Sequence, residues 1–294
     1  MAISKVGVVG GGLMGHGITQ ICAQAGWDVV MREVDDDKVG QCIGKIEKQL
    51  ARAVEKGRME SDEADAVRTR IEGTTDYGAL ADCDLVIEAI SEDLETKLEM
   101  WKAVDPIVKE DAWFATNTSS LAVIDQAAST SRPDRFLGLH FFNPAQVMPL
   151  LEVVQTVTTS DEALAAGFEV GEKLGKKVVH AKDKTGFIVN RLLVPYMLDA
   201  IRAYEEGVGS IDEIDVAMKA GANHPMGPLT LADFVGLDTL VAIGSVMFDE
   251  YRERRFAAPP TLRKMVAAGW YGRKSGKGFY DYSGEKPVPS ELGL

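Results

Sequence analysis

The chain has 294 residues, of which 46% are hydrophobic and 26% charged, which suggests about two globular domains and excludes a disordered or collagen-like chain. Its 32 Lys and Arg against 45 Asp and Glu give a net charge of −13, which disfavours nucleic acid and anionic membranes as partners. No apolar run reaches the length of a membrane span, and the three cysteines suggest neither disulfides nor a zinc site, so we expect a cytoplasmic protein without a metal.

Short apolar segments alternate with segments of helical length over the first part of the chain. Strands are expected at 6–9, 29–33, 85–89, 113–116, 136–140, 151–155 and 177–180. This alternation is typical of βαβ units in a parallel sheet. Beyond it the pattern changes to long helices, expected at 187–206, 211–220 and 229–251. We therefore predict an α/β fold: a Rossmann-type, doubly wound, mostly parallel sheet over residues 1–185, and a second, all-helical domain over 186–294.

A glycine-rich segment, Gly10-Gly11-Gly12-Leu13-Met14-Gly15, follows the first expected strand and fits the G-x-G-x-x-G pattern. In dinucleotide-binding folds such a loop turns tightly, and its backbone approaches a pyrophosphate at a helix N-terminus. The second strand ends at Glu33, where a carboxylate would bind a ribose and repel a 2′-phosphate. These features favour NAD over NADP, although the adjacent Arg32 argues in the opposite direction and FAD proteins share the fingerprint.

Polar side chains follow the next two strands, at the edge of the sheet where ligands of open parallel sheets bind. Glu92 and Lys97 come after the third strand, and they could equally be ordinary charges of a helix. Asn117 and Ser119 come after the fourth strand, and one of them could cap the helix that follows. All four are candidates for a ligand site.

His140 ends the fifth expected strand, where an imidazole can take a proton from an alcohol near neutral pH and return it. Glu152 lies in an apolar strand where burial is expected, and a buried carboxylate requires a partner such as this histidine. Asn190 lies in an apolar stretch, where its amide could cap a helix, bridge elements or donate to a reacting oxygen. The other histidines, which lack metal-ligand spacing, are weaker candidates: His16, His180 and His224.

A basic segment interrupts the acidic chain, because residues 38–58 carry a net charge of +4. Lys45, Lys48, Arg52 and Lys56, which we call the basic face, recur at steps of three and four and so share one side of a helix. A solvated helix surface is the ordinary interpretation. A phosphorylated second ligand is the functional alternative.

Together these motifs resemble those of the short-chain (S)-3-hydroxyacyl-CoA dehydrogenase family, particularly its bacterial members that act on 3-hydroxybutyryl-CoA. The resemblance covers nearly the whole chain and is carried by segments 10–17, 84–92, 117–121, 134–144, 186–191, 225–228, 233–238 and 276–280. It implies NAD-dependent, reversible oxidation of a 3-hydroxyacyl-CoA to a 3-oxoacyl-CoA, and a homodimer formed through the second, substrate-binding domain. Glu33 stands where Asp is common in the family.

The resemblance also implies roles for individual residues. His140 would be the general base, Glu152 its orienting partner, and Ser119 and Asn190 the groups that bind the reacting oxygen. NAD would contact the 10–15 loop together with Glu33, Glu92, Lys97, Asn117, Ser119, Asn143 and Lys274, and the acyl-CoA would contact Ser119, Gln49 and Lys56. Two alternatives remain open: a dehydrogenase of a small free hydroxy acid, as in gulonate-type relatives, and an inactive dinucleotide-binding protein.

Overall fold

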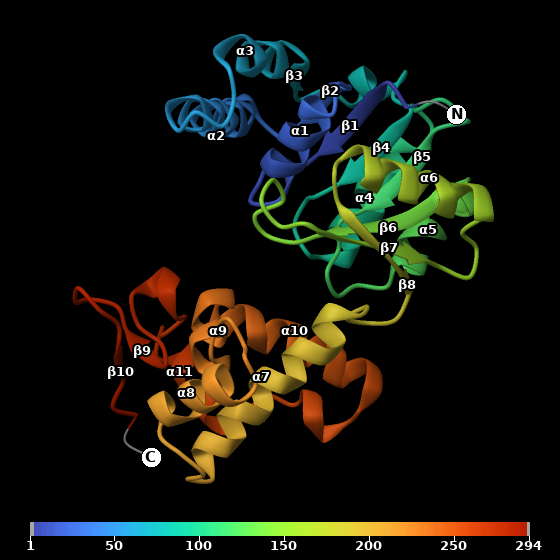
Figure 1. Cartoon of the computed structure of the whole chain (residues 1–294). Coiled ribbons are helices and arrows are strands. Elements are labelled where there is room, and N and C mark those ends of the chain that lie inside the picture. The colour runs from blue at the N-terminus through green and yellow to red at the C-terminus, as the bar shows by residue number, and fades with distance from the viewer. Residues whose placement is uncertain (1–2, 293–294) are drawn as a thin grey trace. The chain divides into compact units, whose positions relative to one another are not determined.

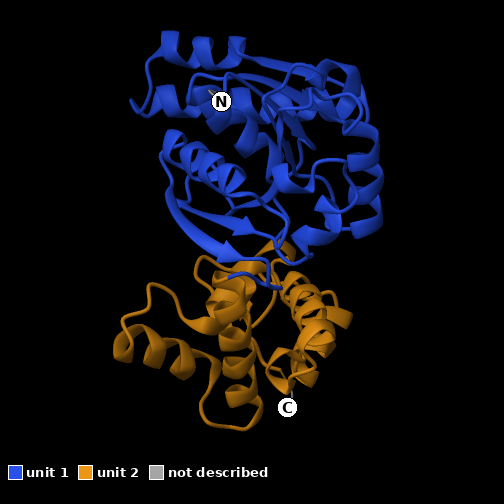
Figure 2. Cartoon of the chain, turned by 90° about the vertical axis from the view of Figure 1, so that its right-hand side faces the viewer, with its two compact units in different colours: residues 1–187 blue, residues 188–294 orange. Residues whose placement is uncertain are grey.

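A computed structural model describes residues 3–292 of the chain, which divides into two compact units, residues 1–187 and 188–294 (Figure 1, Figure 2). The strands of the first unit are β1 (Lys5–Val9), β2 (Asp28–Arg32), β3 (Ile71–Thr74), β4 (Leu85–Glu88), β5 (Trp113–Thr116), β6 (Phe136–Phe141), β7 (Leu150–Gln155) and β8 (Lys177–Lys182). Its helices are α1 (Gly15–Gln24), α2 (Asp36–Glu55), α3 (Ser61–Thr69), α4 (Leu94–Val104), α5 (Val123–Ala127) and α6 (Asp161–Lys173), with 3-10 turns η1 (Tyr77–Leu80) and η2 (Pro133–Arg135).

The strands form one eight-stranded sheet in the order β3-β2-β1-β4-β5-β6-β7-β8. Neighbouring strands are parallel except β6 and β7, so β7 and β8 run opposite to the others. The predicted doubly wound, mostly parallel sheet is confirmed, and every strand expected from the sequence is present. β3 was not expected from the sequence, because it is an edge strand in which only Ile71 is buried and which has no apolar run.

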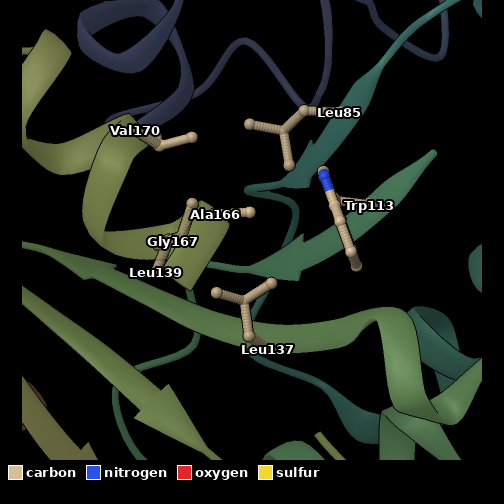
Figure 3. Close-up of a pocket in the computed structure, with 7 residues that line it drawn as sticks. All are labelled: Leu85, Trp113, Leu137, Leu139, Ala166, Gly167 and Val170. Atoms are coloured by element: carbon tan, nitrogen blue, oxygen red, sulfur yellow. The ribbon is translucent and has the colours of Figure 1, made fainter. Parts of the chain in front are cut away.

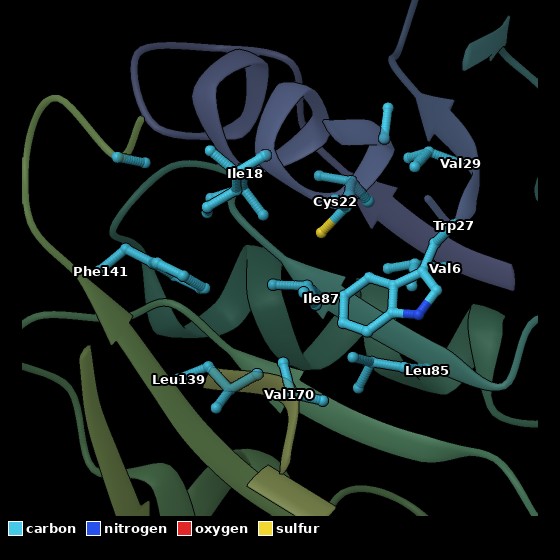
Figure 4. Packing of buried hydrophobic residues seen from close by; sticks show 14 of the residues in the cluster. Val6, Ile18, Cys22, Trp27, Val29, Leu85, Ile87, Leu139, Phe141 and Val170 are labelled. Atoms are coloured by element: carbon cyan, nitrogen blue, oxygen red, sulfur yellow. The ribbon is translucent and has the colours of Figure 1, made fainter. Parts of the chain in front are cut away.

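Helices cover both faces of this sheet. Alternate strand residues point to opposite sides, and apolar residues on both sides pack against helices. On one face, Leu85 and Ile87 of β4 pack with Ile18 of α1, and Figure 4 shows these side chains together. On the other face, Val86 belongs to a second apolar cluster, which includes Trp101 of α4. Figure 3 shows a small pocket beside the first of these apolar clusters. It is lined by uncharged core residues: Leu85, Trp113, Leu137, Leu139, Ala166, Gly167 and Val170. We therefore treat this pocket as part of the core.

The second unit is helical, as predicted, around its own apolar cluster. Its elements are α7 (Val189–Glu205), α8 (Ile211–Gly221), α9 (Pro228–Val235), α10 (Leu237–Tyr251), α11 (Pro260–Ala267), η3 (Arg254–Phe256), η4 (Arg273–Ser275), β9 (Tyr280–Asp281) and β10 (Val288–Pro289). The short antiparallel pair β9–β10 was not expected from the sequence. Within residues 3–292 no single helix has the length and apolar character of a membrane span, and only α9 and α10, bent by 93°, have them as a pair.

Asp84 anchors the beginning of β1 to the beginning of β4. Its carboxylate accepts hydrogen bonds from the backbone amides of Ser4 and Lys5, at 2.7 and 2.9 Å, and from Lys109 Nζ at 2.5 Å. Burial alone would raise the pKa of Asp84, but the hydrogen bonds from Lys109, Ser4 and Lys5 outweigh it and lower the pKa to about 2. The ionised carboxylate therefore stabilises the folded protein.

We expect Asp84→Asn to lower the free energy of unfolding by about 2 kcal/mol at pH 7, because the folded protein binds this proton much less tightly than the unfolded chain. The contribution is complete above the unfolded pKa near 4 and is lost as the pH falls toward about 2. Urea unfolding of the unaltered protein and the variant at pH 7 and pH 3 measures this contribution to the free energy of unfolding. Asp82→Asn is the control, since the Asp82 carboxylate is 72% exposed. Equal losses in the two variants would contradict the prediction.

Candidate active site

The glycine-rich loop between β1 and α1 has the geometry of a dinucleotide-binding turn. Gly10 has a φ of 97°, which residues with side chains rarely adopt, and its amide donates to the Arg32 carbonyl oxygen at 2.9 Å. A Cβ atom at Gly15 would overlap the Gly10 carbonyl oxygen, whereas a Cβ atom at Gly12 would meet nothing within 4 Å. The loop is therefore tightly packed at Gly15 and open at Gly12.

Consecutive backbone amides of this loop are available to a ligand. Within residues 3–292, the N–H groups of Gly12, Leu13, Met14 and Gly15 donate no hydrogen bond to another part of the chain. The N-terminus of α1, at Gly15, adds the positive end of a helix dipole. These donors fit the pyrophosphate of NAD, as the sequence predicts.

Glu33 lies directly after β2 and faces the glycine loop. One of its carboxylate oxygens accepts a hydrogen bond from the Gly11 amide at 2.8 Å. The neighbouring Arg32 is held away by other groups, since its guanidinium lies 3.8 Å from the centre of the Tyr77 ring and its Nε donates to the Thr75 carbonyl. The carboxylate, rather than the guanidinium, therefore lies against the loop, which fits NAD better than NADP.

His140 and Glu152 form a buried pair. The antiparallel register of β6 and β7 places them directly opposite each other, with 2.6 Å between His140 Nδ1 and Glu152 Oε2. His140 is 5% exposed and Glu152 is fully buried, and the rings of Phe142 and Phe187 pack near the imidazole. With a carboxylate at Nδ1, the neutral imidazole carries its proton there and keeps a lone pair on Nε2. The pair can therefore act as a general base with an orienting carboxylate.

Lys97 lies between two acids at the junction of β4 and α4. Its Nζ is 2.5 Å from Glu88 Oε1 and 3.4 Å from Glu92 Oε2, and the side chain is 1% exposed. Thr116 Oγ1 also donates to Glu88, at 2.6 Å. The ammonium predicted to contact the cofactor is thus buried between these carboxylates.

Glu92 accepts several hydrogen bonds from the turn that follows β5. Its Oε1 accepts hydrogen bonds from the hydroxyls of Thr118 and Ser120, at 2.6 and 3.0 Å, and from the Ser119 amide at 2.9 Å. Burial alone would raise the pKa of Glu92, but the Lys97 ammonium and these hydrogen bonds outweigh it and lower the pKa. The ionised carboxylate therefore fixes the position of Ser119.

The two predicted asparagines of this unit lie near His140. Asn117 Oδ1 accepts a hydrogen bond from the Phe141 amide at 3.0 Å, so the ends of β5 and β6 are tied together beside the histidine. Asn143 is exposed in the loop after β6. The structure therefore brings His140, Glu152 and Asn117 together, with Asn143 following in the chain.

The remaining predicted polar contacts belong to the second unit. Asn190 is half-buried near the N-terminus of α7. Lys274, in η4, is paired with Asp238 of α10 at 2.6 Å.

The basic face lies along α2, as predicted, and ends at Lys56, the residue that follows the helix. Lys45, Lys48, Arg52 and Lys56 are all exposed, and within residues 3–292 none of them has a carboxylate within 4.0 Å. The opposite side of the helix is buried through Cys42, Ile46 and Leu50. Four uncompensated cations on one exposed surface favour an anionic ligand.

Gln49 lies at the border between the basic face and the buried side of α2. Its amide group is 3.0 Å from His16 Nε2 and accepts a hydrogen bond from Gln146 at 2.9 Å. His16 was among the weaker candidates from the sequence, because a single histidine inside a helix gives no motif. The available signal was its position four residues after Gly12, within hydrogen-bonding reach of that carbonyl.

Comparison with known proteins gives consistent matches over nearly the full length. Residues 5–184 match the family model "3-hydroxyacyl-CoA dehydrogenase, NAD binding domain", and residues 186–282 match the corresponding C-terminal domain. A 3-hydroxybutyryl-CoA dehydrogenase of Mycobacterium tuberculosis is 47% identical over 96% of this chain and 99% of its own. One of Bradyrhizobium diazoefficiens is 44% identical over 98% of both chains. The crystal structure of M. tuberculosis FadB2 has a TM-score of 0.94 and 46% identity, covering 96% of this chain and all of that one.

Proposed function

The chain belongs to the 3-hydroxyacyl-CoA dehydrogenase family, and from this premise we propose how its own residues carry out the reaction. As a member, it is an NAD-dependent oxidoreductase that interconverts (S)-3-hydroxyacyl-CoA and 3-oxoacyl-CoA. Bound NAD supplies the acceptor for the hydride from C3 of the substrate. The observation that carries the residue assignment is the buried His140–Glu152 pair at 2.6 Å.

His140 is the general base of this proposal. Its Nε2 takes the proton of the 3-hydroxyl group as the C3 hydride leaves, and it returns the proton when the reaction runs in reverse. Glu152 holds the ring through Nδ1 and stabilises the imidazolium that forms. Ser119 and Asn190 donate hydrogen bonds to the oxygen as its charge changes. Glu92 supports this role by fixing the Ser119 backbone.

The proposed cofactor site uses the loop amides for the pyrophosphate and Glu33 for the adenosine ribose. Further contacts are proposed from Glu92, Asn117, Asn143 and Lys274. Because the Lys97 ammonium is buried against Glu88 and Glu92, its proposed part is to hold Glu92 in place.

We place the preferred substrate among short acyl-CoA thioesters such as 3-hydroxybutyryl-CoA, after the names of the relatives. The test is NADH oxidation with acetoacetyl-CoA, longer 3-oxoacyl-CoA thioesters and free acetoacetate at equal concentration. The proposal expects the highest kcat/KM with acetoacetyl-CoA. Preference for free acetoacetate would identify a free hydroxy acid dehydrogenase instead, and no oxidation of any substrate would identify an inactive dinucleotide-binding protein.

The basic face is proposed to bind the phosphates of coenzyme A, with Gln49 at its border. Replacing Lys48, Arg52 and Lys56 together by Ala is expected to raise the KM for acetoacetyl-CoA about tenfold, because three uncompensated cations are lost. The KM for NADH should stay within about twofold. The matched control replaces three exposed lysines elsewhere in this unit, Lys102, Lys173 and Lys177. Equal effects on both KM values would reject the assignment.

A homodimer through the second domain is also proposed. Large apolar side chains are exposed on three of its helices: Leu192, Val216 and Phe234. Light scattering should give twice the mass of the chain, and a monomer would contradict the proposal. The cytoplasmic location expected from the sequence stays a prediction.

A further inference from the structure

Several hydrogen bonds hold the glycine loop, and one of them comes from a side chain that the mechanism does not use. The Gly10 amide donates to a strand carbonyl and the Gly11 amide to Glu33. The Gly12 carbonyl oxygen lies 2.7 Å from His16 Nδ1, and it also accepts a longer hydrogen bond, of 3.4 Å, from the His16 backbone amide. Three successive glycines give the backbone unusual freedom, so each of these contacts restricts the loop.

The hydrogen-bonding groups around His16 specify where its proton lies. The Gly12 carbonyl oxygen can only accept, so Nδ1 must be the protonated nitrogen. In the neutral ring Nε2 then carries a lone pair, and the Gln49 amide nitrogen donates to it at 3.0 Å. Gln49 Oε1 in turn accepts from Gln146 Nε2 at 2.9 Å. Each hydrogen bond in this series, from Gly12 through His16 and Gln49 to Gln146, has one donor and one acceptor only when His16 is neutral with its proton on Nδ1.

We propose that His16 is a positioning residue for the dinucleotide, with Gln49 keeping it in the required tautomer. The inference rests on the proposed binding of NAD to this loop. In a trans peptide the N–H points opposite to the C=O, so fixing the Gly12 carbonyl toward His16 directs the Leu13 N–H the other way. That N–H makes no hydrogen bond within residues 3–292, which leaves it available to a phosphate oxygen.

The same series of hydrogen bonds joins the glycine loop to the helix that carries the basic face. His16 is on α1, Gln49 is on α2 between Lys45 and Lys56 in helical spacing, and Gln146 is in the loop after β6. His16 is 8% exposed, so water competes little for these bonds. The arrangement holds the loop, the basic helix and the segment after His140 in one relative position.

Three substitutions separate the two nitrogens of the ring. The Asn side-chain nitrogen can take the place of Nδ1, that of Gln can take the place of Nε2, and Ala replaces neither. We expect His16→Ala and His16→Gln to raise the dissociation constant for NADH about fivefold, and His16→Asn to stay within about twofold of the unaltered protein. NADH fluorescence titration measures this in the absence of acyl-CoA. The kcat at saturating NADH and acetoacetyl-CoA should change little, because His16 does not act on the reacting atoms.

His180→Asn is the matched control, because His180 is an exposed histidine on β8. Equal NADH affinity of the Ala and Asn variants of His16 would overturn the proposal. If these variants fail to fold, Gln49→Met decides: weaker NADH binding supports the proposal, and unchanged binding overturns it. If the unaltered protein itself binds no NADH, the proposed cofactor site fails, which is a different result from the failure of the His16 assignment.

Discussion

Replacing His140 with Gln is expected to lower kcat for acetoacetyl-CoA reduction by about a thousandfold, the middle of the range for losing a general acid–base group. The Gln amide nitrogen can take the place of Nε2, but it cannot exchange a proton with the substrate oxygen. The dissociation constant for NADH should stay within about twofold, because the glycine loop and Glu33 are untouched. Steady-state kinetics and NADH fluorescence titration measure the two effects separately.

The control for this result is His180→Gln, which makes the same chemical change at an exposed histidine of β8. Its kcat should match that of the unaltered protein. A His140→Gln variant with kcat within about threefold of normal would remove His140 from the role of general base. A loss of NADH binding together with kcat would show instead that the substitution disturbs the fold around β6.

The second large effect is expected at Glu152. Glu152→Gln keeps an oxygen that can accept from His140 Nδ1, so the ring stays oriented, but it removes the charge that stabilises the imidazolium. We expect kcat to fall about a hundredfold, with NADH affinity nearly unchanged. The site is fully buried, which makes the lost charge more important than it would be at the surface.

Glu152→Gln also changes the stability of β7, so its melting temperature must be measured beside its kinetics. The matched control is Gln155→Glu, the reverse exchange of amide and acid, at the partly exposed end of the same strand. Gln155→Glu should leave kcat unaltered. A folded Glu152→Gln variant with normal kcat would show that the carboxylate orients the ring without contributing charge.

The alternation of apolar strands and helices was enough to predict the architecture, and the two strands that carry His140 and Glu152 lie where their apolar runs indicated. The reversal of direction between them could not be predicted, because a strand that is buried on both faces has the same continuous apolar run whichever way its neighbour runs. That reversal produces the register in which His140 faces Glu152. The sequence thus predicted the partners through the chemistry of a buried carboxylate and not through their geometry.

The structure departs from the expected site where a side chain expected to contact a ligand is paired with other residues of the protein. Lys97 lies far from the glycine loop in the sequence, and nothing in its spacing predicted that Glu88 and Glu92 would enclose it. His16 shows the same difficulty, because its main partner is a backbone carbonyl, and backbone groups are present at every position of any sequence. Contacts of this kind follow from the folded path of the chain alone.

Two glycines of the loop, Gly12 and Gly15, are required for different reasons. A side chain at position 15 would overlap the Gly10 oxygen, while one at position 12 would enter open space. We therefore expect Gly15 to be required for folding and Gly12 for binding of NAD. In a saturation library scored once for the amount of protein and once for retention on immobilised NADH, substitutions at Gly15 should be depleted in both selections. Substitutions at Gly12 should disappear only from the second.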